Sequence, residues 1–142
     1  NSNAKGTVIN HAEFKVDNAF IQKAVEACKT LDLKIMVCAE NLERAKEVAA
    51  FNPDFIAVEP PELIGGDVSV SSANPELISD SVKAIHEIND KIIVITGAGV
   101  KTSQDVSKAL ELGTQGVFVA SGIVKADQQE KTIKELLSGF TL

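Results

Sequence analysis

Hydrophobic residues are distributed along the chain in two kinds of segment. Five short segments are almost continuously hydrophobic and rich in β-branched residues; they are residues 6–10, 34–38, 55–59, 91–96 and 116–120. Continuous hydrophobicity, rather than strict alternation, is typical of strands that are covered on both faces, as in a parallel sheet. The five segments therefore predict five buried parallel strands.

Longer segments with helical periodicity separate the predicted strands. Hydrophobic side chains recur every three or four positions in residues 17–31 and again in residues 41–51, which is the spacing of one buried helical face. A third helix is predicted to follow Asn74 and Pro75, because asparagine suits the N-cap and proline suits the first helical turn.

Two further helices are predicted from capping sequences. Thr102 and Asp105 have the spacing of a capping box, and Asp127 with Glu130 has similar spacing. The whole pattern is strand followed by helix, five times, in a single domain of residues 1–142, which predicts an α/β fold with right-handed crossovers. An open doubly wound sheet and a closed eight-stranded barrel both have this order, and periodicity does not distinguish them.

One connection is longer than the others. Residues 60–73 show neither strand nor helix periodicity, whereas loops between a strand and a helix usually take roughly 2–6 residues. Long loops in compact domains are often functional, so we expect a lid here, with a tolerated insertion as the alternative. Pro60 and Pro61 would stiffen its start, and Gly65 and Gly66 would let its tip move.

Composition and charge restrict the class of ligand. A formal net charge of −6 argues against nucleic acid, and the absence of a run of about 18 hydrophobic residues argues against a membrane span. Cys28 and Cys38 lack the spacing of metal or redox motifs, so we expect reduced thiols in a cytoplasmic protein. An anionic ligand would need local donors, such as backbone N–H groups, because the overall charge does not attract it.

The residues that could carry chemistry follow the predicted strands. Glu59 comes directly after four hydrophobic residues, where a carboxylate is costly unless it is paired or functional. Partial desolvation would raise its pKa and make it a better base. His11 lies just past the first strand, and a neutral imidazole can donate a hydrogen bond to a carbonyl group. The structural alternatives are a Glu59 that faces solvent and a His11 that is bonded to backbone.

Small residues end the last two predicted strands, at residues 97–99 (Gly-Ala-Gly) and 120–122 (Ala-Ser-Gly). Ligands bind at the carboxyl ends of parallel strands, and the backbone of such turns can hold phosphate. Glycine-rich turns also occur without any ligand. Cys38 ends the second strand and is expected to be a buried structural thiol rather than a reactive one.

Four motifs, in this order, resemble the archaeal type of triosephosphate isomerase: residues 10–13 (Asn-His-Ala-Glu), 58–65 (Val-Glu-Pro-Pro-Glu-Leu-Ile-Gly), 97–99 and 120–122. The similarity extends from Lys5 to about Leu137, which is nearly the whole chain. It implies a (β/α)8 barrel, to which this chain contributes strands four to eight and their helices.

The resemblance also implies roles for individual residues. Glu59 would move a proton between neighbouring carbons of dihydroxyacetone phosphate and glyceraldehyde 3-phosphate, while His11 polarises the carbonyl group. Five residues match the family's phosphate-binding positions: Ile64, Gly65, Gly99, Ala120 and Ser121. Glu13 and the buried Cys38 would support the site without contacting the substrate. Residues 60–73 would form the lid, and the reaction implies neither a cofactor nor a metal.

The chain departs from the family pattern in three ways. The Asn-x-Lys motif of the family's first strand has no counterpart here, so we expect the isolated chain to be poorly active. Ala12 stands where Ser is common after the histidine. Gly66 and Asp67 stand where the lid often has Thr-Gly, which affects either a backbone angle or the charge near the phosphate.

Two alternatives stay open. Residues 116–125 also resemble the synthase subunit that builds pyridoxal phosphate, which would require Schiff-base lysines at strand ends, and these five strands have none. The second alternative is a non-catalytic barrel fragment that assembles with a partner. Because a partial barrel exposes sheet edges and part of its interior, the expected partner is a further copy, in a homo-oligomer, or the N-terminal units of the barrel.

Overall fold

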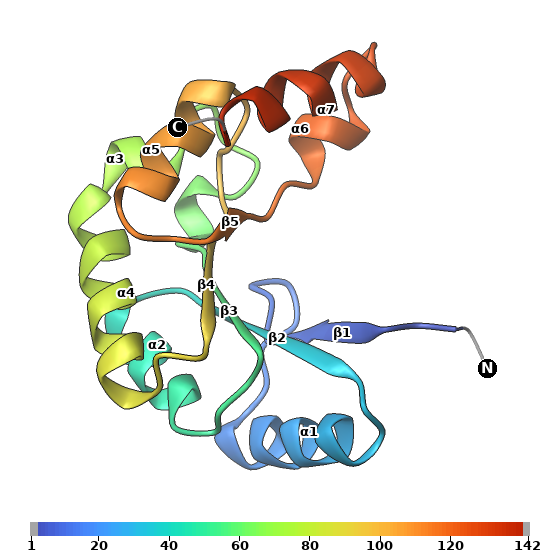
Figure 1. The fold of residues 1–142 in the computed structure, drawn as a ribbon, viewed down its shortest axis with the longest axis vertical. Coiled ribbons are helices and arrows are strands. Elements are labelled where there is room, and N and C mark those ends of the chain that lie inside the picture. The colour runs from blue at the N-terminus through green and yellow to red at the C-terminus, as the bar shows by residue number, and fades with distance from the viewer. Residues whose placement is uncertain (1–2, 141–142) are drawn as a thin grey trace.

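The computed structural model describes residues 3–140, and within this range it contains one parallel sheet (Figure 1). The strands are β1 (Gly6–Ile9), β2 (Lys34–Ala39), β3 (Phe55–Val58), β4 (Ile93–Thr96) and β5 (Gly116–Val117). Their order across the sheet is the order along the chain, and all neighbours are parallel. A doubly wound sheet would reverse its strand order at a switch point. The sequential order therefore identifies part of a (β/α) barrel and excludes the open doubly wound alternative.

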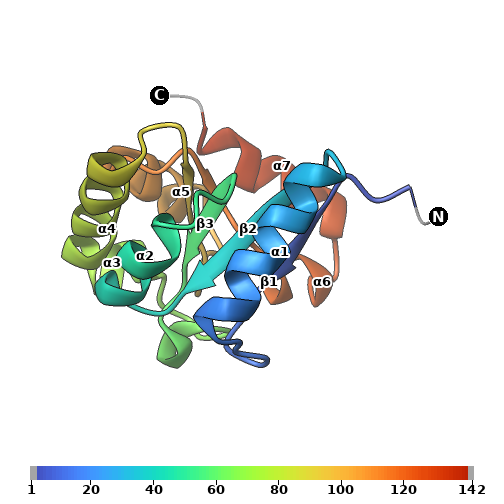
Figure 2. The same ribbon diagram turned by 90° about the horizontal axis from the view of Figure 1, so that it is seen from below.

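Helices follow the strands and cover one face of the sheet. The described helices are α1 (Asn18–Thr30), α2 (Leu42–Ala49), α3 (Val70–Ala73), α4 (Pro75–Ile88), α5 (Ser103–Glu111), α6 (Ser121–Val124) and α7 (Gln129–Ser138), with a 3-10 turn η1 (Pro61–Leu63). Figures 1 and 2 show α1, α2 and α4 side by side along the outer face. This arrangement leaves the inner face of the sheet to the barrel interior.

The two faces of the sheet differ in burial. On the outer face, Val37, Ile56 and Val94 are completely buried beneath the helices. On the inner face, Val8 pairs with Met36 and is 42% exposed, because no described element covers it. The strands of this chain are therefore covered on one face only, as expected for a partial barrel whose interior is exposed, and not on both faces as their hydrophobicity alone predicts. The continuous hydrophobicity fits a closed barrel, in which further strands would enclose this face.

Two of the predicted helix starts are confirmed by their caps. The side chain of Asn74 accepts a hydrogen bond from the Leu77 N–H at 3.2 Å, with Pro75 as the first residue of α4. Thr102 and Asp105 form the predicted capping box before α5. These local signals were readable because a cap depends only on residues within one turn.

The predicted capping box of Asp127 and Glu130 is wrong. Helix α7 begins at Gln129, and its N-cap, Gln128, makes no side-chain cap hydrogen bond. Instead, the Gln129 side chain donates to the carbonyl oxygen of Val124 at 3.1 Å, which ties the helix start back to the end of α6. A side-chain contact back to the end of α6 therefore accompanies this helix start in place of the predicted capping box.

The fifth strand and the long loop also differ from the sequence predictions. Strand β5 pairs with β4 at Gly116 and Val117 and ends there, although the predicted strand extends to residue 120. The chain then turns at Ala120 (φ −117°, ψ −82°) into the short helix α6, which was not predicted. The long loop of residues 60–73 is not wholly irregular, since it begins with η1 and ends with α3. Its glycine-rich part, residues 64–69, is the irregular segment between them.

Candidate active site

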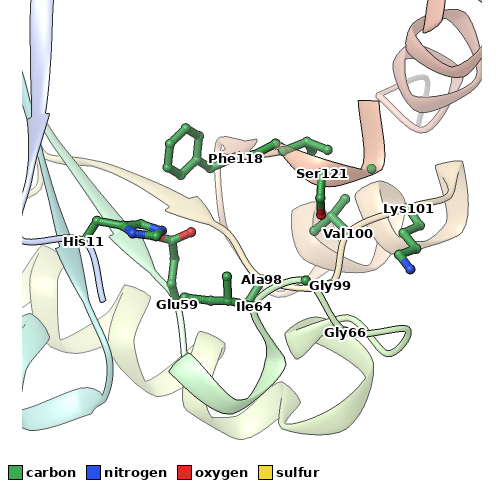
Figure 3. A pocket seen from close by; sticks show the side chains of 14 residues that line it. His11, Glu59, Ile64, Gly66, Ala98, Gly99, Val100, Lys101, Phe118 and Ser121 are labelled. Carbon is green, nitrogen blue, oxygen red and sulfur yellow. The ribbon is translucent and has the colours of Figure 1, made fainter. Parts of the chain in front are cut away.

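The carboxyl ends of the strands surround one pocket. It is lined by all seven residues that the sequence assigned to catalysis or phosphate binding: His11, Glu59, Ile64, Gly65, Gly99, Ala120 and Ser121. In Figure 3, the side chains of His11 and Glu59 point toward one another, and Ser121 lies farther along the pocket. These residues come from strand ends that are far apart in the sequence, and the sequential sheet brings them together.

Glu59 is held at the end of β3 by close packing against β4. The register pairs Val58 with Thr96, so that Glu59 stands beside Gly97 on the inner face. A Cβ atom on Gly97 would lie 2.2 Å from Glu59 Oε1, which leaves no room for any other residue. Glu59 is 6% exposed, and within residues 3–140 its Oε2 atom has no hydrogen-bond partner. A fixed carboxylate oxygen is therefore left for a ligand group.

The surroundings of Glu59 favour its protonated form. Burial raises the pKa of the Glu59 carboxyl above its ordinary value of 4.5, while the nearby Cys38 thiol and His11 oppose this shift. Cys38 is itself 3% exposed, as predicted, and its pKa is raised by burial first and by the Glu59 carboxylate second. The thiol therefore stays protonated and can act only as a neutral donor beside the carboxylate.

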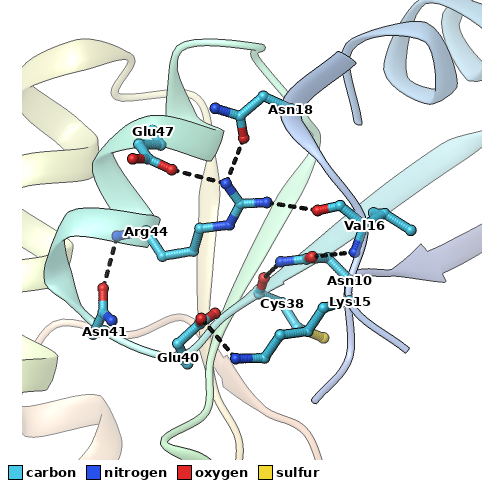
Figure 4. A network of polar contacts seen from close by, with 9 residues as sticks. All are labelled: Asn10, Lys15, Val16, Asn18, Cys38, Glu40, Asn41, Arg44 and Glu47. Carbon is cyan, nitrogen blue, oxygen red and sulfur yellow. Dashed lines mark hydrogen bonds and ion pairs between the residues drawn. The ribbon is translucent and has the colours of Figure 1, made fainter. Parts of the chain in front are cut away.

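His11 is placed by the residue before it. Asn10 has a left-handed backbone (φ 61°) and is 4% exposed. Its Nδ2 donates to the Cys38 carbonyl oxygen at 2.8 Å, and its Oδ1 accepts from the Val16 N–H at 3.0 Å (Figure 4). Asparagine tolerates this conformation better than most residues. The bonded turn directs the chain from β1 so that His11 enters the pocket.

The hydrogen bonds of His11 fix its tautomer. The Glu13 backbone N–H donates to His11 Nδ1 at 3.4 Å, so in the neutral ring the proton is on Nε2. The Glu13 carboxylate lies 3.8 Å from the same nitrogen and is 90% exposed. Glu13 thus adjoins His11 from the solvent side rather than from within the protein.

Arg44 of α2 fastens the segment that carries His11. Its guanidinium donates to the Val16 carbonyl oxygen at 3.0 Å, to Glu47 Oε2 at 2.8 Å and to Asn18 Oδ1 (Figure 4). The Arg44 side chain is 16% exposed, so it is partly shielded from water. Planar guanidinium groups that make several hydrogen bonds are well suited to holding a turn in one position.

The far end of the pocket consists of tight turns. Gly99 has φ 72°, and a Cβ atom there would lie 2.1 Å from the Val68 carbonyl oxygen. Ala98, although not glycine, also has a left-handed backbone at φ 66°. The turn of residues 97–99 therefore lies directly against the returning part of the long loop, and the predicted small residues are needed for this close approach.

Sequence reasoning missed four lining residues, Val100, Lys101, Phe118 and Val119, of which the aromatic ring and the lysine are the two that add a new kind of group. Phe118 follows Val117, which pairs with Thr96, so Phe118 lies beside Gly97 on the inner face. Phe118 could have been placed in the site from the sequence, because it lies two residues before Ala120 and alternate residues of a strand share a face. Lys101 is the other, and among the described lining residues it is the one lysine or arginine. No sequence pattern indicated it.

Two other features are absent from residues 3–140, a metal-binding cluster and a membrane-spanning helix. No group of three or more His, Cys, Asp or Glu side chains is placed to hold a metal ion there. In the same range, no helix is long and apolar enough to cross a membrane.

Parallel strands in sequential order, with a pocket at their carboxyl ends, define the (β/α)-barrel class of proteins. Within this class, the chain belongs to the triosephosphate isomerase family, whose model matches residues 1–136. It is 49% identical to the triosephosphate isomerase of Methanocaldococcus jannaschii and 47% identical to that of Archaeoglobus fulgidus, each over 94% of this chain. The chain covers only 61% and 60% of the length of these two relatives.

Solved structures agree on the fold. Thiamine phosphate pyrophosphorylase from Pyrococcus furiosus matches with a TM-score of 0.69 at 21% identity, covering 96% of this chain and 59% of that one. The N-acetylmannosamine-6-phosphate 2-epimerase from Clostridium perfringens matches with a TM-score of 0.59 at 22% identity, over 80% of this chain and 48% of that one. At such low identity, these similarities support the barrel architecture alone.

Proposed function

We propose that the complete protein interconverts dihydroxyacetone phosphate and D-glyceraldehyde 3-phosphate, with Glu59 as the base and His11 as the electrophile. The observation that carries the proposal is the buried Glu59 carboxylate, which faces His11 in a pocket that ends at glycine-rich turns. Membership of the isomerase family supports the choice of reaction.

Glu59 moves the proton. Its carboxylate takes a proton from the carbon next to the substrate carbonyl and returns it to the carbon that carried the carbonyl, while the hydroxyl proton passes to the former carbonyl oxygen. The two carbons thereby exchange oxidation states without any external reagent. The raised pKa of Glu59 brings it closer to the operating pH, which improves a general base. The space at Gly97 lets this carboxylate stay in one position while it acts on both carbons.

His11 stabilises the charge that develops on oxygen. With Nδ1 accepting from the Glu13 N–H, the Nε2–H is available to donate to the substrate carbonyl and then to the enediolate oxygen. A fixed donor in a site with little water is worth more than the same donor in solution. Asn10 and Arg44 hold the turn that presents it.

The phosphate group would lie at the other end of the pocket. Gly65, Gly99 and Ser121 line this end, where backbone N–H groups can approach an anion. The loop of residues 60–73 would act as a lid that excludes water during the reaction. Binding phosphate through backbone N–H groups suits a chain with a net charge of −6, which has no general attraction for phosphate.

The uncovered inner face of the sheet supports the proposal that the active protein is larger than this chain. The relatives contain a part that this chain does not match, and strands from that part would cover Val8 and its neighbours. A family lysine would also come from there, so the isolated chain is expected to show little turnover.

A cytoplasmic homo-oligomer remains our expectation for the complete protein. Family membership favours the isomerase over the pyridoxal phosphate synthase alternative.

The test is a coupled isomerase assay on the full-length protein. Replacing the base, Glu59→Gln, should lower kcat by about 10²- to 10⁴-fold, the usual contribution of a general base, with the inhibition constant for inorganic phosphate nearly unchanged. The control is Glu62→Gln, which removes an exposed carboxylate three positions away. Full turnover in Glu59→Gln would refute the assignment, as would equal losses in both variants. The isolated 142-residue chain, assayed in parallel, should be nearly inactive.

A further inference from the structure

The tip of the long loop, residues 64–67, is held by little of its own packing. A Cβ atom on Gly65 would have no atom within 4 Å, and one on Gly66 would meet only the Leu63 backbone. The backbone N–H groups of Ile64 and Gly66 donate to Pro61 and Leu63, inside the same loop. The tip therefore needs some contact with another segment if it is to stay over the pocket.

An ion pair provides that contact. The Asp67 carboxylate accepts from Lys101 Nζ at 2.5 Å, which joins the loop tip to the turn after β4. The pair is exposed, with side-chain exposures of 95% for Asp67 and 39% for Lys101. Pairing with Lys101 lowers the pKa of the Asp67 carboxyl below its ordinary value of 3.8.

Lys101 is a fixed point for this contact. Its backbone N–H donates to Asp105 Oδ2 at 3.1 Å, and the same oxygen accepts from the Thr102 N–H at 2.9 Å. Asp105 belongs to the capping box of α5, so the Lys101 backbone is anchored to a helix start. Of the two partners, Asp67 is the one on the glycine-rich segment.

The loop rejoins the body of the protein just after the ion pair. The Val68 backbone lies against Gly99, where an added Cβ would be only 2.1 Å from the Val68 oxygen. The Val70 N–H then donates to the Ala98 carbonyl oxygen at 3.2 Å. Residues 69 and beyond are thus fixed to the turn at 97–99, and the tip before them can swing unless Asp67 holds it.

We propose that Asp67 and Lys101 are positioning residues, which hold the loop tip over the pocket as an electrostatic latch. The consequence for substrate rests on the proposed function, but the latch itself does not. Because both groups are exposed, the latch is weak, breaks at each opening and weakens as salt screens the two charges.

The latch also balances charge beside the phosphate end of the pocket. Asp67 alone would repel a phosphate dianion, and Lys101 is the one lysine or arginine among the described lining residues. When paired, the two charges cancel near the ligand. Losing Lys101 therefore has two harmful effects, since it opens the latch and leaves the negative charge of Asp67 unpaired. Losing Asp67 also opens the latch, but it leaves the positive charge of Lys101 free to attract phosphate.

The first experiment measures amide hydrogen exchange of residues 62–70 in the full-length protein without ligand, at low and high salt. In low salt, D67N and K101M should exchange about 1.5- to 5-fold faster than the parent, the range expected for an exposed ion pair. High salt should reduce the difference. The charge-swapped variant D67K/K101D should regain most of the protection, because it rebuilds the pair with reversed signs.

The matched control breaks an ion pair of similar geometry far from the loop. Lys134 Nζ and Glu130 Oε1 lie 2.6 Å apart on α7, with exposures of 72% and 84%. E130Q and K134M should leave exchange at residues 62–70 unchanged. The proposal is overturned if D67N and K101M exchange at the parental rate, or if the charge-swapped variant exchanges as fast as the single variants.

The second experiment measures the dissociation constant for inorganic phosphate. K101M should bind more weakly than D67N, and the double variant D67N/K101M should bind more tightly than K101M, because removal of Asp67 relieves the repulsion. Equal affinities in K101M and D67N/K101M would overturn the charge-balancing role. A protein that lacks isomerase activity but shows the exchange pattern would retain the latch and lose only the proposed function.

Discussion

Two carboxylates at opposite ends of one short segment behave in opposite ways. Glu59 ends a buried strand, is 6% exposed and has a pKa raised chiefly by burial. Asp67, eight positions later, has a side chain that is 95% exposed and a pKa lowered by its ion pair with Lys101. The strand end removes water from a carboxylate, while the loop tip leaves a carboxylate in water beside a cation. The same chemical group thus suits the role of a base in one place and, in the proposed latch, the role of an anchor in the other.

The two groups also affect folding stability in opposite pH ranges. Since folding raises the pKa of Glu59, its stabilising contribution is complete below its ordinary value of 4.5 and is lost as the pH rises through the raised pKa. Folding lowers the pKa of Asp67, so its contribution is present above 3.8 and is lost as the pH falls through the lowered pKa. At a pH above both of these pKa values, the ionised Glu59 therefore costs folding stability, whereas the ionised Asp67 adds to it.

The largest effect should come from breaking the close packing that fixes Glu59. In Gly97→Ala, the new methyl group would lie 2.2 Å from Glu59 Oε1, so the carboxylate must move by about 1 Å. A displacement of this size typically costs about 10²-fold in rate. We expect kcat to fall by roughly that factor in the full-length protein, while phosphate affinity changes little, as measured by steady-state kinetics and phosphate inhibition.

The control for this substitution is Gly116→Ala on the neighbouring strand β5. A methyl group there would meet only Ile95 Cγ1 at 3.9 Å, which is an ordinary contact. Its kcat should stay near that of the parent. If Gly97→Ala kept full activity, Glu59 would have room to move, and the contrast between a fixed strand end and a mobile loop tip would fail.

An intermediate effect is expected at the other fixed strand end. Asn10→Ala keeps the left-handed backbone without asparagine's tolerance for it and loses two hydrogen bonds, so the free energy of unfolding should fall by about 2 kcal/mol. Asn10→Gly loses the same hydrogen bonds but accepts the backbone angle, so it should lose about half as much. Urea unfolding of the two variants measures the difference, and equal losses would show that the backbone angle at Asn10 costs nothing.

The fold was largely predictable because its signals are local or periodic. Strand positions followed from continuous hydrophobic runs, and the N-cap of α4 and the capping box of α5 each lie within a single turn. Two features were beyond such signals. Strand β5 ends early because the chain turns at Ala120, and α7 begins where Gln129 contacts Val124. Barrel strand order is a property of tertiary packing, and only the resemblance indicated it.

The candidate site was predictable where chemistry conflicts with its surroundings. A carboxylate after four hydrophobic residues identified Glu59, and small residues at strand ends identified Gly99 and Ser121. Lys101 gave no such signal, because its partner Asp67 is 34 positions away and both residues are ordinary surface types. Charge pairs between loops depend on how the loops meet, and a single sequence does not encode that in any local pattern.

The smallest effect is expected from replacing the Cys38 thiol beside Glu59. This replacement separates the two influences on the Glu59 pKa, burial and the thiol. Burial raises this pKa, and the Cys38 thiol lowers it in part. In Cys38→Ala the donor is lost, so the acid limb of kcat/KM should move to higher pH, whereas Cys38→Ser keeps an O–H donor and should leave the limb near its parental position. The substrate's own ionisation is common to all three proteins and cancels in the comparison. Activity on the alkaline plateau should change little, because the base is deprotonated there in each protein. If the acid limb in Cys38→Ala moved to lower pH, a water molecule would have replaced the thiol as a better hydrogen-bond donor. The Glu59 carboxylate would then be open to water, and burial would not be the property that distinguishes it from Asp67.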